Sequence, residues 1–318
     1  MNSPFPWIGG KGKLLWLIDE LAPYSYDCFV DVFGGSGTVT FNHPLYKSCM
    51  EIYNDRDAEL VNFMRVLKYH PLALLTELKF LPYHARDEFG VLCKYLSHEE
   101  FTEDYLEEEL QLANVLFDPP DAEIVKNLIR EHSGQMDIQR AANFYKRQRY
   151  SFNGTGRSVA PEPVNIRSFL FSVWECSRRL ENVFIENMDF EPLIRSRDKK
   201  GTFFYCDPPY YKAEKYYKGS FTEEDHRRLH RVLSQVKGFA MVSYNDCPFI
   251  FELYSPDFYI FSTERPDSLS QKRGKQYGEL IITNYDPRNY GRQLSLSPQL
   301  SQYKILSIPN KNVGGNTQ

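Results

Sequence analysis

Residues 27–41 read DCFVDVFGGSGTVTF, and this stretch decides the fold class. Its first seven residues are mostly apolar and predict a buried strand, which breaks into a glycine loop. A helix is expected to begin inside that loop and to run to Phe41. Residues 49–53 predict a second strand, and Asp55 stands just after its end. A doubly wound α/β sheet typically begins with this order: a strand, a glycine loop, a helix, a second strand and an acid.

Strand and helix patterns recur further along the chain. Residues 71–149 have helical patterning without a convincing strand, and 149–163 form a glycine- and proline-rich loop. The predicted fold class is therefore α/β, with a Rossmann-like sheet interrupted by a mainly helical insert. Helices are predicted at 12–21, 57–69, 166–180 and 223–236, and later strands at 183–186, 202–206, 239–243, 258–262 and 279–285. The predicted domains are 1–69 (first part of the catalytic domain), 70–164 (insert), 165–290 (second part) and 291–318 (a polar, poorly ordered tail).

Composition excludes several classes of protein. The chain has 318 residues, of which 42% are hydrophobic and 15% aromatic, values too high for a disordered chain. It lacks an apolar run long enough to span a membrane, and its first residues do not resemble a secretory signal. The six cysteines include no C-x-x-C pair, so no zinc site or disulfide framework is indicated. We therefore expect a cytoplasmic protein without a metal and without a membrane association.

The charges are unevenly distributed. Ten acids and no Lys or Arg lie between Lys94 and Lys126, so the net charge of −4 becomes about +6 for the remainder of the chain. A nucleic-acid partner is therefore compatible with the sequence. Basic clusters at 146–149, 195–200, 227–231 and 272–275 either contact phosphates or are ordinary solvated faces.

The glycine loop and Asp55 together suggest a nucleoside cofactor. Glycines permit positive φ and close approach of a ligand, and a helix start offers N–H groups. An acid at the end of the next strand suits the hydroxyls of a ribose. The loop does not have the G-x-G-x-x-G dinucleotide fingerprint, and a plain strand-to-helix turn is the alternative.

Asp207-Pro208-Pro209-Tyr210 follows the apolar residues 203–206 and carries the chemistry. The prolines hold the residues that precede them in an extended conformation. The Asp207 carboxylate and the Pro208 carbonyl then provide two adjacent acceptors, whose natural partner is an exocyclic amino group. The ring of Tyr210 provides a plane on which a base stacks.

These motifs resemble the D12 class of amino-directed DNA methyltransferases, the group that includes the bacterial DNA adenine methylase. The similar segments occur in the family's order and span about residues 4–287. Weaker similarities lie at 149–154, 220–222 and 243–245. The four main segments are PWIGGK (6–11), DVFGGSG (31–37), YND (53–55) and DPPY (207–210).

The resemblance implies transfer of a methyl group from S-adenosylmethionine to N6 of adenine in double-stranded DNA, without a metal. It implies that the catalytic residues are Asp207, Pro208, Pro209 and Tyr210. It also implies a cofactor site formed by Trp7, Lys11, Asp31, Phe33, Gly34, Gly35, Gly37, Asp55 and Asp207. For Trp7 the alternative is a buried anchor, for Lys11 a solvated charge, and for Asp31 a hydrogen-bonding role at the strand end.

The region expected to recognise DNA is the insert and the loop that follows it. The base is expected to leave the duplex to reach the site. The loop after Asn153 departs from the family's longer hairpin, so recognition of GATC is not implied. Alternatives are methylation of cytosine N4 and a catalytically silent DNA-binding protein, whereas RNA is a less favoured acceptor. A cognate restriction endonuclease is a possible partner, and a monomer is the default. Candidates for DNA contact are Arg147, Arg149, Asn153, Arg157, Lys272, Arg273 and Lys275.

Overall fold

The computed structural model describes residues 3–7, 9–44, 49–80, 111–127, 137–151, 154, 158–160, 169–212, 221–266, 276–290 and 303–309. The chain divides into two compact units. The helical unit comprises Met1–Gly10 and Asp57–Glu181, and the sheet unit comprises Lys11–Arg56 and Asn182–Gln318.

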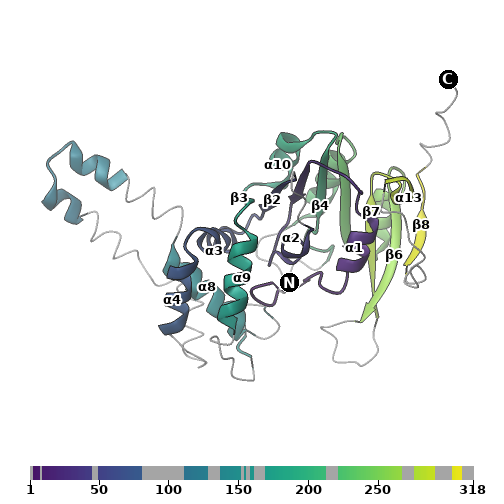
Figure 1. Ribbon diagram of the computed structural model, residues 1–318. Helices are drawn as coiled ribbons and strands as arrows, with labels where there is room; N and C mark the ends of the chain where they lie inside the picture. The colour runs from purple at the N-terminus through teal and green to yellow at the C-terminus, as the bar shows by residue number, and fades with distance from the viewer. Residues whose placement is uncertain are drawn as a thin grey trace. The chain divides into compact units, whose positions relative to one another are not determined.

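The described strands of the sheet unit form one sheet in the order β3-β2-β1-β4-β5-β7-β6-β8 (Figure 1). The five neighbouring strands β3, β2, β1, β4 and β5 are parallel, whereas β7 is antiparallel to both β5 and β6. The order reverses at β1, which lies between β2 and β4, and open α/β sheets bind ligands at such a switch point. The strands are β1 (Cys28–Asp31), β2 (Met50–Asn54), β3 (Val183–Glu186), β4 (Thr202–Cys206), β5 (Phe239–Asn245), β6 (Tyr259–Pro266), β7 (Gln276–Thr283) and β8 (Tyr303–Ser307).

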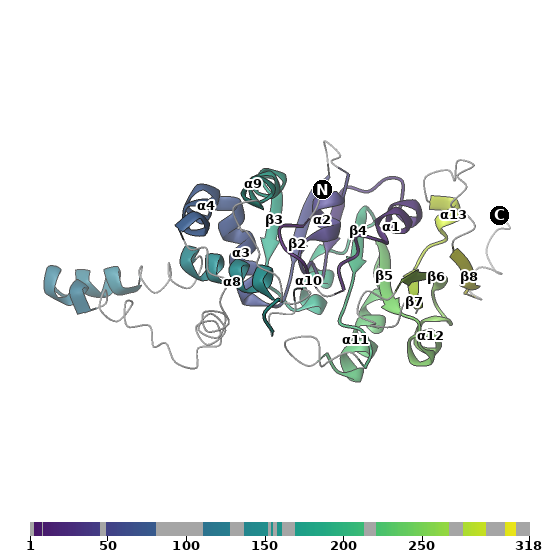
Figure 2. The same ribbon diagram turned by 90° about the horizontal axis from the view of Figure 1, so that it is seen from below.

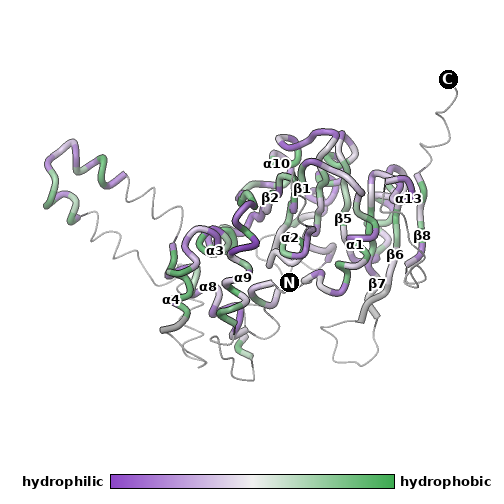
Figure 3. Tube along the Cα trace, viewed as in Figure 1, coloured by the Kyte–Doolittle hydropathy of each residue, from purple (hydrophilic) through white to green (hydrophobic). Residues whose placement is uncertain are grey.

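Helices cover both faces of this sheet, as Figure 2 shows for α1 and α2 on one side and α10 to α12 on the other. Val30 and Phe204 lie in the core cluster that includes α10 to α12, whereas Phe29 and Phe203 lie in the cluster that includes α1 and α2. Alternate residues therefore serve opposite faces, which explains the continuous apolar runs of the strands (Figure 3). The helices are α1 (Leu15–Leu21), α2 (Thr38–Asn42), α10 (Phe190–Arg197), α11 (Glu223–Leu233), α12 (Pro248–Tyr254) and α13 (Pro287–Tyr290).

The α/β prediction is confirmed, and the strands expected at 183–186 and 202–206 have the predicted bounds. Helices α10 and α12 were not predicted, because their apolar periodicity is short. Part of the tail that we expected to be poorly ordered forms β8, which pairs with β6. That prediction is wrong for these five residues, because backbone pairing with an edge strand does not require strong apolar alternation.

The helical unit is built on α3 (Ala58–Tyr69), α4 (Pro71–Phe80), α8 (Ile138–Tyr150) and α9 (Leu170–Arg179). Asn62 and the Asp137 backbone exchange hydrogen bonds of 2.8 and 2.9 Å, and Glu59 forms an ion pair with Arg140. The helices predicted within 71–149 are present where that range is described. Because α3 and α9 pack with α4 and α8, the compact unit extends beyond the predicted 70–164 insert at both ends.

Asn54 joins the carboxyl ends of three strands. Its side-chain nitrogen donates to the carbonyls of Val32 (2.9 Å) and Met188 (3.1 Å), and its oxygen accepts from Met188 N at 2.9 Å. Asn54 is 1% exposed, so water does not replace these bonds.

We predict that Asn54→Ala lowers the free energy of unfolding by about 2–4 kcal/mol, because it leaves three buried or partly buried backbone groups without their partner. Urea unfolding measures the loss. Asn289→Ala, at an exposed position, serves as the control and is expected to change stability by less than about 0.5 kcal/mol. Equal losses in the two variants would contradict the bridging role.

Candidate active site

Asp207 follows β4 directly and has two polar partners. The ammonium of Lys11 is 2.6 Å from its carboxylate, and Ser243 on β5 donates to Oδ1 at 2.9 Å. The Tyr205 hydroxyl is in turn 3.1 Å from Ser243 Oγ. The Lys11 side chain is 2% exposed and that of Asp207 is 20% exposed. These contacts fix the carboxylate at the edge of the sheet and leave part of it accessible.

The rest of the predicted catalytic segment is equally fixed. Pro208 is buried and Pro209 is half-buried. Tyr210 is also buried, and its hydroxyl donates to Glu279 on β7 at 2.5 Å. The Lys11 ammonium lies over the Tyr210 ring, 4.8 Å from its centroid. Glu279 was missed by the sequence analysis, although an acid within an otherwise apolar predicted strand was a signal for it.

The switch point brings the glycine loop beside this segment. Asp31 at the end of β1 is in register with Tyr205 of β4, and Val32 N donates to the Tyr205 carbonyl at 2.9 Å. The loop that begins after Val32 and the segment that begins at Asp207 therefore leave adjacent strands at the same edge. A cofactor held at the glycine loop would therefore lie beside the Asp-Pro-Pro-Tyr segment.

The glycine loop holds a carboxylate of the chain itself. Gly35 N donates to Asp55 Oδ2 at 2.9 Å, and Gly37 N donates to the Gly34 carbonyl at 2.8 Å. Gly35 and Gly37 have φ values of 50° and 74°, which glycine adopts without strain. These two N–H groups, which we expected to be available to a ligand, are thus engaged within the chain. Because a pyrophosphate is held by such donors, the loop does not favour a dinucleotide.

Asp31 is fully buried and accepts a hydrogen bond of 2.7 Å from Thr40 on α2. The pKa of Asp31 is raised from 3.8 to about 7, chiefly by burial; the hydrogen bonds from Thr40 act against this rise, and the nearby charges of Asp207 and Asp55 add to it. Asp31, Asp55 and Asp207 therefore lie at the carboxyl ends of β1, β2 and β4, and the Lys11 ammonium is paired with Asp207. This arrangement favours a cationic ligand.

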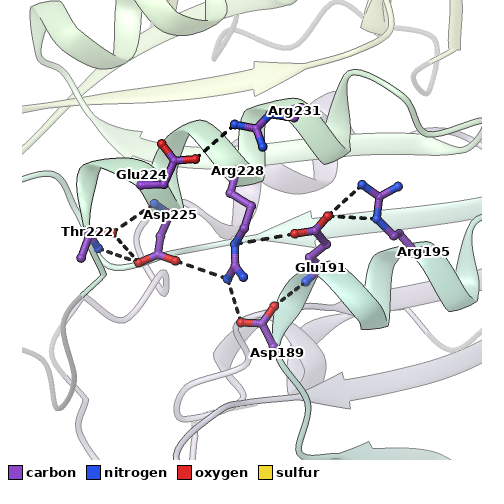
Figure 4. Close-up of polar contacts among 8 residues, drawn as sticks. All are labelled: Asp189, Glu191, Arg195, Thr222, Glu224, Asp225, Arg228 and Arg231. Carbon is purple, nitrogen blue, oxygen red and sulfur yellow. Dashed lines mark hydrogen bonds and ion pairs between the residues drawn. The ribbon is translucent and has the colours of Figure 1, made fainter.

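An aromatic cluster adjoins the same edge. The ring of Phe33 lies 5.6 Å from Phe190 and 5.8 Å from Phe221, between centroids. Asp189 caps α10, and Arg228 on α11 bonds to Asp189 at 2.8 Å (Figure 4). The Arg228 guanidinium also lies 4.2 Å from the centroid of the Phe190 ring. Phe190 was not predicted, because it belongs to no motif with a distinctive spacing. Phe221 lies in the weak similarity at 220–222, to which no role was assigned.

The arginines of α10 and α11 are paired with acids. Figure 4 shows Arg195 bonded to Glu191 and Arg231 bonded to Glu224, in contacts of 2.8 and 3.1 Å. Arg228 also contacts Asp225 at 3.3 Å. For the described members of the clusters at 195–200 and 227–231, the structure favours the interpretation as ordinary helix surface over phosphate binding.

Two other predicted residues belong to the helical unit. Trp7 packs against Phe5 and Phe144, at centroid distances of 5.9 and 6.5 Å, which agrees with a role as an aromatic anchor. Arg147 is 5% exposed and lies 5.5 Å from the Phe144 ring. Arg147 is thus part of the interior of this unit, and its contact with DNA stays a prediction.

Arg149 is also engaged within the helical unit. Its guanidinium bonds to the Pro4 carbonyl at 2.5 Å and lies 3.7 Å from the centroid of the Phe169 ring. Gly154, at φ 67°, lies so close to Pro6 that a Cβ there would be 2.2 Å from the Pro6 carbonyl oxygen. The remaining candidates for DNA contact lie outside the described residues: Asn153, Arg157, Lys272, Arg273 and Lys275.

The described residues contain no group of three or more His, Cys, Asp or Glu side chains arranged to hold a metal ion. None of their helices has the length and hydropathy needed to cross a bilayer.

The sheet order, the acids at the switch point and the Asp-Pro-Pro-Tyr segment are those of an enzyme that methylates the exocyclic amino groups of nucleic-acid bases. Comparison with known families agrees: the model of the D12 class N6 adenine-specific DNA methyltransferases matches residues 7–268. The chain belongs to this family, which confirms the resemblance seen in its motifs.

Two named relatives support the assignment. The chain is 30% identical over 302 residues to the type II methyltransferase M1.LlaDCHI of Lactococcus lactis subsp. cremoris, covering 88% of this chain and 94% of the relative. It is 25% identical over 211 residues to the modification methylase StsI of Streptococcus sanguinis, covering 66% of this chain and 29% of that protein. The chain is thus a site-specific adenine DNA methyltransferase, and its family implies S-adenosylmethionine as the methyl donor.

We predict a pH dependence of stability from Asp31. Because its folded-state pKa exceeds the unfolded value, the folded protein holds this proton more tightly, and the stabilisation is complete only below about pH 4. Relative to Asp31→Asn, the wild-type free energy of unfolding falls by up to about 1.4 kcal/mol per pH unit as pH rises from about 4 to 7, then levels off.

Denaturant unfolding of both proteins across pH 4.5–8 measures this difference. Thr40→Val removes a hydrogen bond that stabilises the Asp31 carboxylate, so it moves the levelling-off to higher pH. Identical pH profiles for the wild type and Asp31→Asn would contradict the burial of a protonated group.

Proposed function

We propose that Asp207 and Pro208 accept hydrogen bonds from N6 of an adenine turned out of the duplex, while Tyr210 stacks on the base. The observation that carries this proposal is the fixed Asp207 carboxylate beside an aromatic ring at the switch point. The N6 lone pair is delocalised into the adenine ring, so the nitrogen becomes pyramidal and positively charged as it attacks. Acceptors fixed in advance stabilise this charge more than they stabilise the neutral base, which accelerates the reaction.

The residues at the sheet edge fit S-adenosylmethionine, whose sulfonium and ammonium groups are cationic. Asp31, Asp55 and Asp207 supply carboxyl groups around the predicted site. The rings of Phe33 and Phe190 suit a planar adenine, and Asp55 suits ribose hydroxyls. When bound, the sulfonium supplies an activated methyl group, so the side chains are required only to bind, orient and stabilise charge.

Lys11 occupies the position that we assign to the target amino group. Its ammonium donates to the Asp207 carboxylate and lies over the Tyr210 ring, the two contacts proposed for N6 and the base. We infer that an entering adenine displaces Lys11 from both partners. Competition of this kind favours a base that forms both contacts, and it keeps the buried carboxylate paired between turnovers.

We further propose that the helical unit reads the DNA. The acidic segment from Glu99 to Glu123, part of which lies outside the described residues, is expected to face away from the phosphates. Double-stranded DNA is the proposed partner, and a cognate restriction endonuclease and a monomeric state stay predictions. In the helical unit, the residues proposed to contact DNA are Arg147, Arg149, Asn153 and Arg157. In the sheet unit they are Lys272, Arg273 and Lys275.

We predict that Asp207→Ala lowers the rate of methyl transfer at least about 10²–10³-fold, because it removes an acceptor for the charge that develops on N6. Mass spectrometry of nucleosides after incubation of the protein with S-adenosylmethionine and DNA measures N6-methyladenine directly. Asp257→Ala, in the loop before β6, is the control with unchanged activity. N4-methylcytosine as the product, or wild-type transfer by Asp207→Ala, would overturn the assignment.

A second prediction concerns the glycine loop. A Cβ on Gly34 would be 2.2 Å from the ring of Tyr53, which is fully buried and donates to the Gly35 carbonyl at 2.7 Å. Gly34→Ala therefore displaces the ring and the loop, and it is expected to weaken S-adenosylmethionine binding about tenfold or more.

Isothermal titration with S-adenosylmethionine measures the affinity of the Gly34→Ala variant. Gly12→Ala is the matched control, because a Cβ at Gly12 meets nothing within 4 Å. Equal affinities for the two variants would mean that the loop does not shape the cofactor site.

A further inference from the structure

Glu279 is a buried acid in the interior of the sheet. It lies on β7, in register with Asn245 of β5 on one side and Thr263 of β6 on the other, and its exposed fraction is 0%. Removing a carboxyl group from water is costly unless strong hydrogen bonds replace the lost hydration. Stability alone therefore does not favour an acid at this position, and its partner points to its role.

One partner is the hydroxyl of Tyr210, which donates to Glu279 Oε2 at 2.5 Å. This distance is typical of a hydrogen bond between a hydroxyl group and a charged carboxylate, which is about twice as strong as a neutral one. The bond fixes the ring at its hydroxyl end, whereas Lys11 lies over its face. Tyr210 is 6% exposed, so water contributes little to holding it.

The adjacent strand β5 holds the neighbours of Tyr210 in the same way. Ser243 donates to Asp207 at 2.9 Å, and Asn245 donates to the Tyr211 carbonyl at 3.5 Å. Successive parts of the segment are thus attached to two strands, and Glu279 supplies the attachment of the aromatic ring.

The orientation of this ring affects the chemical step. A base stacked on a fixed plane keeps its amino nitrogen in line with the methyl donor, and a small displacement greatly slows the reaction. A phenol that donates to a carboxylate also carries more electron density in its ring. Such a ring stabilises the positive charge that develops on the stacked adenine better than an ordinary phenol does.

We propose that Glu279 is a positioning residue for methyl transfer, which acts by fixing and polarising the ring of Tyr210. This inference rests on the proposed function, in which Tyr210 stacks on the target adenine. It assigns Glu279 an effect on the rate of the chemical step, with little effect on the binding of DNA or of S-adenosylmethionine.

The test measures single-turnover methylation of duplex DNA that carries the recognition sequence, which modification-sensitive sequencing identifies. Glu279→Leu keeps a similar volume and lacks an acceptor, so its rate is expected to fall about 10- to 100-fold with dissociation constants nearly unchanged. Glu279→Gln keeps an acceptor without the charge and is expected to recover part of the rate. If the β7 variants fail to fold, Tyr210→Phe removes the same hydrogen bond and leaves Glu279 in place.

Two readouts separate positioning from a structural role. The double variant Tyr210→Phe/Glu279→Leu is expected to be no slower than the slower single variant, because both remove one interaction. 2-Aminopurine at the target position is expected to show altered fluorescence in Glu279→Leu, since its stacking partner is no longer fixed. The matched control is Glu51→Gln on β2, a buried acid 2.5 Å from His43, whose single-turnover rate is expected to equal that of the wild type.

A wild-type rate in Glu279→Leu would overturn the proposal. So would a rate loss in the double variant equal to the product of the losses in the two single variants. A rate loss accompanied by an equal loss of S-adenosylmethionine binding would also overturn it, because that pattern indicates general damage. Absence of N6-methyladenine with the wild-type protein would instead contradict the proposed function, so the two failures are distinguishable.

Discussion

The ion pair between Lys11 and Asp207 is the interaction around which the site is arranged. It joins a segment near the N-terminus to the end of β4, across 196 positions of the sequence, at a donor–acceptor distance of 2.6 Å. A buried ammonium and a largely buried carboxylate each compensate for the other's lost hydration, so neither remains in place alone. Ser243 supplies a further hydrogen bond to the carboxylate. The carboxylate to which we assign the target base is therefore held by two partners of the chain itself, and fixed acceptors are the condition for electrostatic catalysis.

A sheet that is apolar on both faces makes this rigidity possible. Alternate residues of β1 and β4 enter two separate core clusters, so close packing on both faces holds these strands in place. Several of the polar groups of the site lie at the strand ends, where Asp31, Asn54 and Asp207 are found. Asn54 satisfies the backbone after β1 and after β3. The core and these end residues thus follow from one pattern, in which apolar strands end in polar residues.

The sequence was sufficient to predict the features that depend on local residues. The strand at 202–206, the glycine loop and the Asp-Pro-Pro-Tyr segment follow from apolar runs, glycines and prolines that act on their neighbours. Features that depend on tertiary contact were missed. Glu279 is significant only because Tyr210 lies 2.5 Å away, and β8 forms only because β6 offers an edge. The basic residues of α10 and α11 illustrate the same limit, since their pairing with Asp189, Glu191 and Asp225 is invisible in a linear charge pattern.

The connections between the two units have a bearing on function. The chain passes from one unit to the other at residues 10/11, 56/57 and 181/182. The first connection adjoins Lys11, and the second follows Asp55 by one residue. If the helical unit reads the DNA as proposed, a change in its backbone on binding would be transmitted covalently to these two residues. If a base displaces Lys11 from Asp207 as proposed, a connection at this position would link recognition of the target to the opening of the acceptor site. The enzyme would then discriminate between DNA sequences at the chemical step as well as at binding, as expected when binding of the correct substrate completes the active site.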